Sequence, residues 1–461
     1  MALFGLALLL AGNWALPLID RDEPRFAEAS REMRQSGDWI LPRFNGNYRF
    51  DKPPFIYWCQ AACYGALGEN VFAARLPSAM FATVTALLLL FWGRRLGQPR
   101  AGFHASIMFL TSLAVLIWGR LSVADMPMIF FFTLAVWSGW EVTRPSARPH
   151  WHWFFYASLA LGFQAKGPEA WLPLLGLWIC RWRRPDNFRL SAKPMLLGIV
   201  FTSALVAVWA APALIQTHGD FFRVGIGRHV IHRSFDPMEG HGFGGWLYFA
   251  LLPFFFVTFF ASFFPWSIWF PVALRNGPGN DFEKYLLTQA AIVFVVFTLL
   301  ATKLLHYTLP AFPCLALWLA LRRGSEPLAP RRLVLGAAAM ACLVCLAAAA
   351  FPFAGSRMIA ANLWRALHSQ IQPGTRVAAV EFAEPSIVWE CRRATTNHIE
   401  FIDVAQAADF LRGAPPRCLI LPTKDWNASQ FNAPTNAIAV HAAGIDTASF
   451  HQWDLTAVVR P

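Results

Sequence analysis

Long apolar blocks separated by short polar gaps run along most of the chain. A helix needs roughly 20 apolar residues to cross ~30 Å of hydrocarbon, and most of these blocks approach that length. The pattern predicts a polytopic α-helical membrane protein, because a membrane β-barrel would show short segments of alternating polarity. We expect about eleven spans, over residues 3–19, 70–93, 102–119, 124–141, 152–165, 168–182, 195–215, 246–271, 285–302, 304–321 and 333–354.

Two apolar segments near the N-terminus are interpreted individually. Residues 3–19 resemble a signal peptide in length, but they lack a basic start and a small-x-small cleavage site, so we interpret them as the first span. Residues 56–68 are apolar but short, which favours a re-entrant or interfacial segment.

The chain changes character after residue 355. The segments "TRVAAVEF", "RCLILPT" and "NAIAVHAA" have the composition of strands, and "EPSIVWECRR" and "DVAQAADFLRG" that of amphipathic helices. We therefore expect a transmembrane domain over residues 1–355 and a small C-terminal α/β domain over residues 356–461.

The positive charge of the chain follows the membrane pattern. The formal net charge is +12, but only 14% of the residues are charged, whereas soluble domains have ~25%. Basic residues gather in short gaps between apolar blocks, as the positive-inside rule predicts for cytoplasmic loops. This distribution argues against nucleic-acid binding. These basic residues are Arg94, Arg95, Arg100, Arg144, Arg148, Arg181, Arg183, Arg184, Arg189, Lys193, Arg275, Lys284, Arg322, Arg323, Arg331 and Arg332.

Placing the basic gaps inside the cell assigns the remaining segments to the outer side. Loops 20–69 and 216–245 face outward, as do the turns near residues 125, 166 and 303 and the C-terminal tail. With spans alternating in direction, none of these basic gaps has to lie on the outer side. We therefore expect the large loops and the tail to lie on the outer face of the membrane.

Six of the eight cysteines lie in or beside apolar blocks, where they act as small buried hydrophobic residues. Cys391 and Cys418 lie in the tail. In the periplasm either a disulfide between them or two free thiols is compatible with the sequence.

The loop over residues 20–69 holds an unusual share of the chain's charges. Residues 24–36 have helical character, with Phe26, Ala29 and Met33 on one face, which is typical of a helix on the membrane surface. Mutual pairing in a solvated loop would account for most of the charges. It accounts less well for charges at both ends of the loop, beside membrane segments, where a charge needs a partner or a function. The acids are Asp20, Asp22, Glu23, Glu28, Glu32, Asp38 and Asp51, and the bases are Arg21, Arg25, Arg31, Arg34, Arg43, Arg49 and Lys52.

Other outward turns add residues of the same kinds. "SVADMP" places Asp125 at the start of a span, and "QAKGPE" supplies Lys166 and Glu169. "TKLLHYTLP" supplies His306 between Lys303 and Tyr307, which at i, i+4 would share a helical face. Lysines and arginines hold phosphate, while carboxylates act as bases or metal ligands. This face of the membrane therefore suits a phosphate-bearing lipid.

At this point the residues carry a family resemblance. "DEPRFAEASREMRQSGDWILPRFNGNYRFDKPPFIYW" resembles the first periplasmic loop of the aminoarabinose lipid A transferases. That family belongs to the GT-C glycosyltransferases, which use polyprenyl-phosphate sugars and include the protein mannosyltransferases. "ADMPM", "QAKGP", "RHVIHRSF", "GWLYFALLPF", "FPW" and "TKLLHYTLP" continue the resemblance in order, over roughly residues 10–320.

The resemblance implies roles for individual residues. Asp22 matches the loop acid that faces the donor's anomeric carbon and the acceptor, and Asp125 matches a second essential aspartate, so both are predicted to be catalytic. The predicted substrate-binding residues are Glu23, Arg25, Lys52, Lys166, Lys303 and Tyr307, of which Arg25 and Lys52 match the groups that hold the donor phosphate.

The resemblance also implies a divalent metal ion. The family has Glu before the lysine of "EKP" and a histidine in the second large loop; here the matching residues are Asp51 and His229. Asp51 reaches about one methylene less than Glu. No Rossmann-type or P-loop glycine motif occurs, so we expect no nucleotide cofactor.

The resemblance thus implies a GT-C glycosyltransferase of the bacterial inner membrane, with its active site facing the periplasm. It would move a sugar from a polyprenyl-phosphate donor to a lipid A, glycan or protein acceptor, with inversion. The expected partners are these lipids and the surrounding membrane, and no nucleic acid. The alternatives are a transporter or flippase of a lipid-linked sugar, and a non-catalytic assembly protein. The sugar, the acceptor and the oligomeric state stay open.

Overall fold

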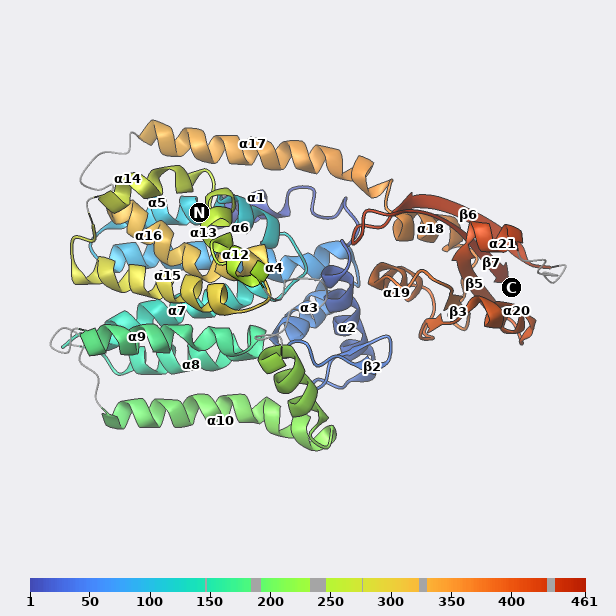
Figure 1. Ribbon diagram of the computed structural model, residues 1–461, viewed down its shortest axis with the longest axis horizontal. Helices are drawn as coiled ribbons and strands as arrows, with labels where there is room; N and C mark the ends of the chain where they lie inside the picture. The colour runs from blue at the N-terminus through green and yellow to red at the C-terminus, as the bar shows by residue number, and fades with distance from the viewer. Residues whose placement is uncertain (146, 184–191, 233–245, 276, 323–329, 429–435) are drawn as a thin grey trace. The chain divides into compact units, whose positions relative to one another are not determined.

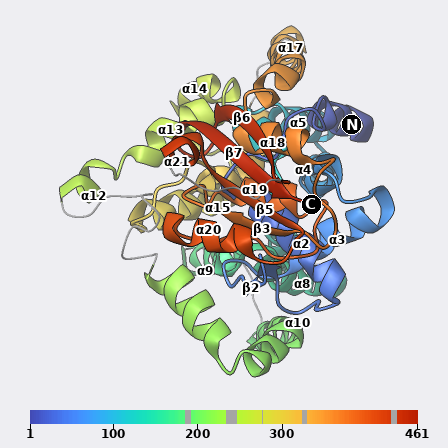
Figure 2. The same ribbon diagram turned by 90° about the vertical axis from the view of Figure 1, so that its right-hand side faces the viewer.

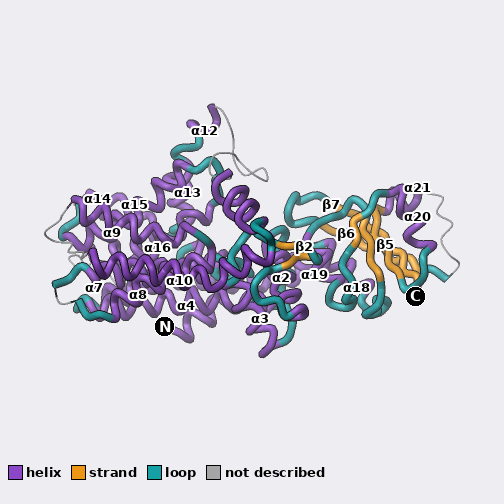
Figure 3. The backbone as a smooth tube through the Cα atoms, turned by 90° about the horizontal axis from the view of Figure 1, so that it is seen from below, coloured by secondary structure: helices purple, strands orange, loops and turns teal. Residues whose placement is uncertain are grey.

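The computed structural model describes residues 1–145, 147–183, 192–232, 246–275, 277–322, 330–428 and 436–461. The chain forms two compact units, and each is described by itself. The first comprises Met1–Ala11, Phe50–Cys59 and Leu76–Val344, and the second comprises Gly12–Arg49, Gln60–Arg75 and Cys345–Pro461. The first is helical, whereas the second also contains strands (Figures 1 and 3).

The first unit is a bundle of helices around an apolar core (Figure 1). Aromatic rings fill much of this core: Trp92 stacks on Trp137 at 5.8 Å, and Phe282 meets Trp92 edge-on at 5.6 Å. The helices of the bundle are α1 (Ala2–Leu10), α4 (Val71–Arg95), α5 (Pro99–Leu110), α6 (Leu113–Trp118), α7 (Asp125–Val142), α8 (His150–Lys166), α9 (Leu172–Arg183), α10 (Ala192–Gln216), α12 (Trp246–Ala250), α13 (Phe254–Ser262), α14 (Phe270–Arg275), α15 (Asp281–Leu299) and α16 (Phe312–Arg322).

Fewer helices than expected are long and apolar enough to cross a membrane unaided. Among the described residues there are four: Val71–Arg95, Ala192–Gln216, Asp281–Leu299 and Arg331–Gly355, the last within α17 (Pro330–Gly355). A fifth is obtained if Phe254–Ser262 and Trp266–Arg275, which are bent by 115°, count as one span. The expected count of about eleven continuous spans is therefore not confirmed.

The interruptions have local physical causes. The expected span 102–119 divides between α5 and α6, because Ser112 is extended, with ψ 140°, and the Leu113 N–H donates instead to the Phe264 carbonyl. The expected span 3–19 ends early, at Leu10. Beyond it, Gly12 has φ +66°, which glycine adopts at no steric cost.

The second unit contains a five-stranded sheet in the order β4-β3-β5-β7-β6 (Figure 2). β3 is parallel to β4 and β5, and β7 runs antiparallel to β5 and β6. The three segments expected to be strands contain β3, β5 and most of β6, and the two expected helices contain α19 and α20. The bounds are β3 (Arg376–Ala379), β4 (Glu400–Phe401), β5 (Arg417–Pro422), β6 (Ile438–Ile445), β7 (Gln452–Arg460), α18 (Ile359–Leu367), α19 (Pro385–Cys391), α20 (Val404–Arg412) and α21 (Thr423–Ala428).

Both faces of this sheet are covered, as the alternation of its side chains requires. Cys418 and Ile420 of β5 belong to one apolar cluster, which includes residues of α18 and α19. Leu419 and Leu421 belong to the other cluster, which includes residues of α20. Cys391 lies in the first cluster with Cys418, and both are free, buried thiols, so the structure has no disulfide between them.

The second unit also contains the charged helix α2 (Asp22–Ser36), which Figure 1 shows close to α3 (Phe55–Leu67). Phe26, Ala29 and Met33 are at most 4% exposed, so this face of α2 packs on protein and α2 is not a helix on the membrane surface. Some of its charges are buried as well: Arg31 lies 2.8 Å from Glu28, and both side chains are fully buried. A solvated loop is therefore the wrong description of Glu28 and Arg31, whereas Asp22 and Arg34 are exposed.

Candidate active site

A buried ion pair joins the start of α7 to the end of α8. Asp125 is the first residue of α7 and Lys166 is the last residue of α8. Lys166 Nζ lies 2.9 Å from Asp125 Oδ1, and the two side chains are 7% and 6% exposed. A buried charge requires a partner, because water no longer solvates it. The fold thus brings together two predicted site residues from different outward turns.

A sharp turn after Lys166 gives it a second acidic partner. Gly167 has φ +106°, a conformation that residues with a side chain rarely adopt. The chain then enters the short helix Pro168–Trp171, where Glu169 Oε1 lies 3.2 Å from Lys166 Nζ. Carboxylates on two sides therefore fix the position of the Lys166 ammonium group.

An aromatic segment completes this cluster. His306 Nε2 lies 3.9 Å from Asp125 Oδ1, and Lys166 Nζ lies 5.6 Å from the centre of the Tyr307 ring. Both rings belong to the short helix Leu305–Ala311. The sequence placed His306 in an outward turn but assigned it no role. Its presence between two predicted site residues was the signal that could have identified it.

Lys303 lies in a different setting from the one expected. It precedes the helix that carries Tyr307, so the two residues do not share a helical face. Its Nζ donates to the carbonyl oxygens of Thr298 and Leu300, both at 2.6 Å, and of Phe297 at 3.3 Å. Cations are stabilised by the carbonyls at a helix C-terminus, which explains why Lys303 turns back toward α15.

Lys52 and Asp51 lie beside each other in the first unit. Lys52 Nζ is 3.0 Å from Asp51 Oδ1, and the two side chains are 19% and 22% exposed. Lys52 also interacts electrostatically with Asp125, so it belongs to the same charged region. The side chain of His229 lies outside the described part of the structure, so the expected Asp51–His229 metal pair remains a prediction.

The remaining predicted site residues lie on α2, in the second unit. Asp22 is the first residue of α2 and is exposed, whereas Arg25 is half-buried. Glu23 is 2% exposed and accepts hydrogen bonds from Arg75 Nε at 2.8 Å and Arg75 Nη2 at 2.6 Å. The meeting of this set with Asp125 and Lys52 remains a prediction.

Arg75 was missed by the sequence analysis. Besides binding Glu23, it donates to the carbonyl oxygens of Asn13, Leu16 and Pro17 at 2.8–3.0 Å. These bonds hold the irregular chain that replaces the second half of the expected span 3–19. The available signal was an arginine inside the apolar block 70–93, because such a charge needs a buried partner.

Chemically, the first unit offers a fixed arrangement of two carboxylates, an ammonium group, an imidazole and a phenol around Asp125. Groups held by packing and ion pairs stabilise developing charge without having to reorganise. The Lys52 ammonium group contacts the neighbouring residue Asp51 and is partly exposed. It is therefore better placed than Lys303 to accept a new anionic partner. The arrangement suits the binding of a phosphate-bearing ligand.

Comparisons with known proteins agree with this description. Residues 13–218 match the family model "Dolichyl-phosphate-mannose-protein mannosyltransferase". The chain is 32% identical over 336 residues to the undecaprenyl phosphate-alpha-4-amino-4-deoxy-L-arabinose arabinosyl transferase of Edwardsiella ictaluri. That match covers 69% of this chain and 58% of the relative, so the chain spans little more than half of the relative's length.

Two solved structures share the fold. The crystal structure of ArnT from Cupriavidus metallidurans bound to undecaprenyl phosphate has a TM-score of 0.77, with 16% identity, and the match covers 98% of this chain and 96% of that one. The Archaeoglobus fulgidus oligosaccharyltransferase, in complex with Zn and sulfate, has a TM-score of 0.51, with 12% identity, and the match covers 92% and 67% of the two chains.

The chain is therefore a multi-pass membrane protein with the GT-C fold. Its resemblance to the aminoarabinose lipid A transferases, and to the related protein mannosyltransferases, is confirmed.

Proposed function

We propose that this protein is a glycosyltransferase of the bacterial inner membrane. It transfers a sugar from a polyprenyl-phosphate donor to a lipid A, glycan or protein acceptor at the periplasmic face, with inversion. The relatives supply the donor class, since the Edwardsiella protein is named for an undecaprenyl phosphate aminoarabinose donor and the Cupriavidus protein binds undecaprenyl phosphate.

The observation that carries the proposal is the buried cluster of Asp125, Lys166 and His306. The Asp125–Lys166 distance of 2.9 Å joins two short motifs of the family resemblance in space, with His306 beside them. Burying two opposite charges is costly in free energy, and here the pair lies beside an imidazole and a phenol at the ends of helices, as expected of a functional site. Fixed charges at the end of membrane helices are typical of an ion- or phosphate-handling site.

The reaction is a displacement at the anomeric carbon of the donor sugar. The acceptor oxygen forms the new bond to this carbon while the bond to the phosphate oxygen breaks, and the polyprenyl phosphate leaves with the electron pair. Asp22 takes the proton if the acceptor is a hydroxyl, and it orients the acceptor if that group is a phosphate. One displacement inverts the configuration of the sugar.

The leaving phosphate carries the developing negative charge, so cations lower the barrier most. Lys52 and Arg25 are the proposed phosphate ligands, with Tyr307 and Lys166 setting the local field. Lys303 has three N–H donors, and all three point to carbonyl oxygens. It would have to release one carbonyl to bind phosphate, so we assign it a supporting role.

A metal ion at Asp51 would meet a competitor. The Asp51 carboxylate already accepts from the Lys52 ammonium group, so a metal ion bound to Asp51 would lie beside a positive charge that opposes it. The Asp51–His229 metal pair therefore stays a separate prediction, and the proposed reaction is written with side chains alone.

The alternative, a flippase or transporter, is less well supported. The charged residues of the first-unit site cluster at helix ends, whereas a transporter places charged groups near the middle of the bilayer. None of the relatives and structures described above is named a transporter.

The proposal is tested with the full chain in lipid vesicles that contain an undecaprenyl-phosphate sugar and lipid A. We expect sugar-modified lipid A and free undecaprenyl phosphate in equal amounts, both measured by mass spectrometry. The same analysis of lipid A and surface glycans from cells with and without the protein identifies the natural acceptor. Movement of the donor between leaflets with no loss of sugar would contradict the proposal and favour the flippase.

The Asp125–Lys166 pair provides a mutational prediction. Asp125→Asn keeps an oxygen for Lys166 but removes the charge that positions it, so we expect transfer to slow about 10²-fold, as misplaced catalytic groups do. Glu169→Gln is the matched control, because it removes the other acidic partner of Lys166 and leaves the Asp125 contact in place. We expect the control to lose less transfer activity than Asp125→Asn, because the 2.9 Å contact between Asp125 and Lys166 is kept. Equal initial rates for Asp125→Asn and wild type would exclude a role for this pair.

A further inference from the structure

A second cluster of carboxylates lies in the second unit, apart from the residues discussed above. Asp20, Glu384 and Asp446 each offer a carboxylate oxygen, and these oxygens lie within 4.8 Å of one another. The three residues come from the segment before α2, the residue before α19, and the loop between β6 and β7. Three like charges at this separation repel one another unless a cation or protons compensate them.

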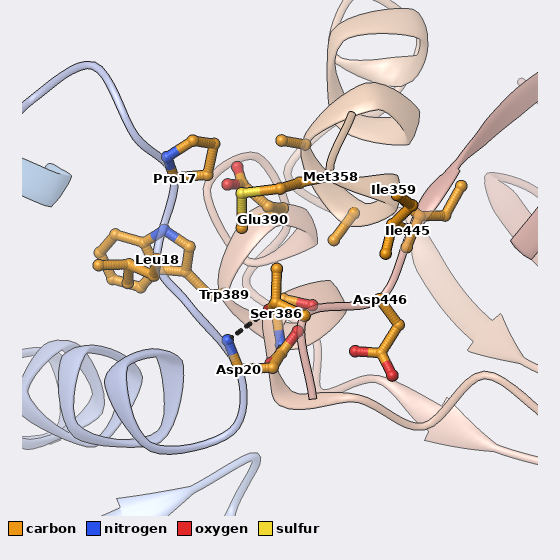
Figure 4. Close-up of a pocket in the computed structure, with 13 residues that line it drawn as sticks. Pro17, Leu18, Asp20, Met358, Ile359, Ser386, Trp389, Glu390, Ile445 and Asp446 are labelled. Carbon is orange, nitrogen blue, oxygen red and sulfur yellow. Dashed lines mark hydrogen bonds between the residues drawn. The ribbon is translucent and has the colours of Figure 1, made fainter. Parts of the chain in front are cut away.

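The surroundings of the cluster are largely buried. Asp20 and Asp446 line a small pocket of about 10 Å³, which is room for about one water-sized sphere. Figure 4 shows both residues around this pocket, with Ser386 beside Asp20. Burial raises the pKa of Asp20 to about 7, and the charges of Glu384 and Asp446 raise it as well.

Ser386 provides the independent observation. Its side chain is 6% exposed and lines the same pocket. The hydroxyl lies close enough to the Asp20 carboxylate to lower the pKa of that group, but it forms no hydrogen bond of full geometry among the described residues. A buried hydroxyl oxygen without a partner costs free energy, and binding an ion or a water molecule would satisfy it.

The existing contacts leave room for a ligand. Asp20 Oδ1 accepts from the Ser386 backbone N–H at 2.8 Å, and Asp446 accepts from the backbone N–H groups of Ala448 and Ser449 and from the Ser449 hydroxyl. Each carboxylate has about four lone-pair sites, so further bonds are available to both. Glu384 faces Arg21 at 3.3 Å, but Arg21 is 49% exposed and can move into solvent.

We propose that Asp20, Glu384 and Asp446 form a calcium site. Calcium prefers oxygen ligands at about 2.3–2.6 Å and tolerates irregular geometry, so its ligands lie up to roughly 5 Å apart. Magnesium demands a smaller and nearly octahedral arrangement, which three separate chain segments rarely supply. A bound calcium ion would tie the start of α2 to the sheet-bearing part of the second unit, two residues before Asp22.

To test this, the full chain is purified and treated with EGTA to remove bound calcium. It is then titrated in a calorimeter with calcium chloride and, separately, with magnesium chloride. We expect one calcium site per chain and at least about tenfold weaker magnesium binding. Glu384→Gln removes one ligand, and we expect it to weaken calcium binding at least about tenfold. Glu381→Gln is the matched control: it removes a carboxylate of the same unit that pairs with Lys424 at 3.3 Å, outside the cluster, and should leave the affinity unchanged.

If Glu384→Gln does not fold, Asp20→Asn replaces it with the same expectation, since Asn still accepts from the Ser386 N–H. Three outcomes would overturn the proposal: no calcium binding by wild type up to about 10⁻³ M, equal affinity for magnesium, or an equal loss in the Glu381→Gln control. The titration needs no sugar donor, so its result is independent of the proposed transfer activity.

Discussion

Asp22→Asn is expected to slow sugar transfer roughly 10³-fold when the acceptor is a hydroxyl, because a general base contributes ~10²–10⁴-fold. Asp22 opens α2 with an exposed side chain, while the adjacent Glu23 is buried. The substitution keeps the size of the side chain and removes only its charge and basicity. The initial rate in donor-loaded vesicles measures the effect, with kcat falling and KM nearly unchanged.

The size of this effect also reports on the acceptor. A phosphate acceptor needs no strong base, so Asp22→Asn would then cost only about tenfold, through lost orientation. Asp38→Asn is the matched control, because Asp38 lies in the same loop and its Oδ1 accepts from the N–H groups of Ile40 and Leu41, which Asn can also satisfy. Wild-type rates for Asp22→Asn would contradict the assignment of Asp22 as a catalytic residue.

Arg75→Met is expected to lower the free energy of unfolding by about 3–5 kcal/mol, the usual cost of leaving one half of a buried ion pair unpaired. The Glu23 carboxylate, which is 2% exposed and also accepts from the Ile19 N–H at 2.9 Å, would lose the charge of the Arg75 guanidinium group. The same substitution would remove the hydrogen bonds that Arg75 donates to three backbone carbonyl oxygens, those of Asn13, Leu16 and Pro17. Denaturant titration of the purified protein measures the change.

Two controls separate this effect from a general loss of charge. The double substitution Glu23→Gln and Arg75→Met removes both charges, so we expect it to recover part of the lost stability. Arg34→Met removes an arginine that is 43% exposed and pairs with Glu69 at 2.9 Å, and it should cost less than ~1 kcal/mol. If Arg75→Met were as mild as Arg34→Met, the buried pair would not be what anchors α2.

Both predictions depend on α2 being a rigid support for Asp22. Glu28 lies 2.8 Å from Arg31 and 3.2 Å from Arg392, a residue that follows α19. Arg31 also stacks on the ring of Trp389 at 3.8 Å. Because water is excluded from these contacts, they fix α2 more firmly than surface ion pairs would. The charges of the first loop therefore have a structural explanation in addition to the proposed catalytic one.

The local sequence pattern predicted secondary structure correctly where that structure depends on a single segment. The helical character of residues 24–36 is realised in α2, and the tail segments identified from their composition contain strands or helices at those positions. The Asp125 and Lys166 turns also lie together in the first unit. These features depend on residues close in sequence, or on the rule that outward turns share one side of a membrane.

The sequence by itself determined that this is a helical membrane protein of high apolar content, with its unusual charges at helix ends and in one early loop. The tertiary structure decided which charges pair, and three of its choices differ from the expectation. The first helix ends at Leu10 because Arg75 holds the chain that follows, Lys303 turns back to the carbonyls at the end of α15, and Glu28 and Arg31 are buried together. The sequence pattern did not show which charges would be buried or which distant groups would meet them, such as Arg392 beside Glu28, because a buried charge is satisfied by whichever group the fold brings within hydrogen-bonding distance.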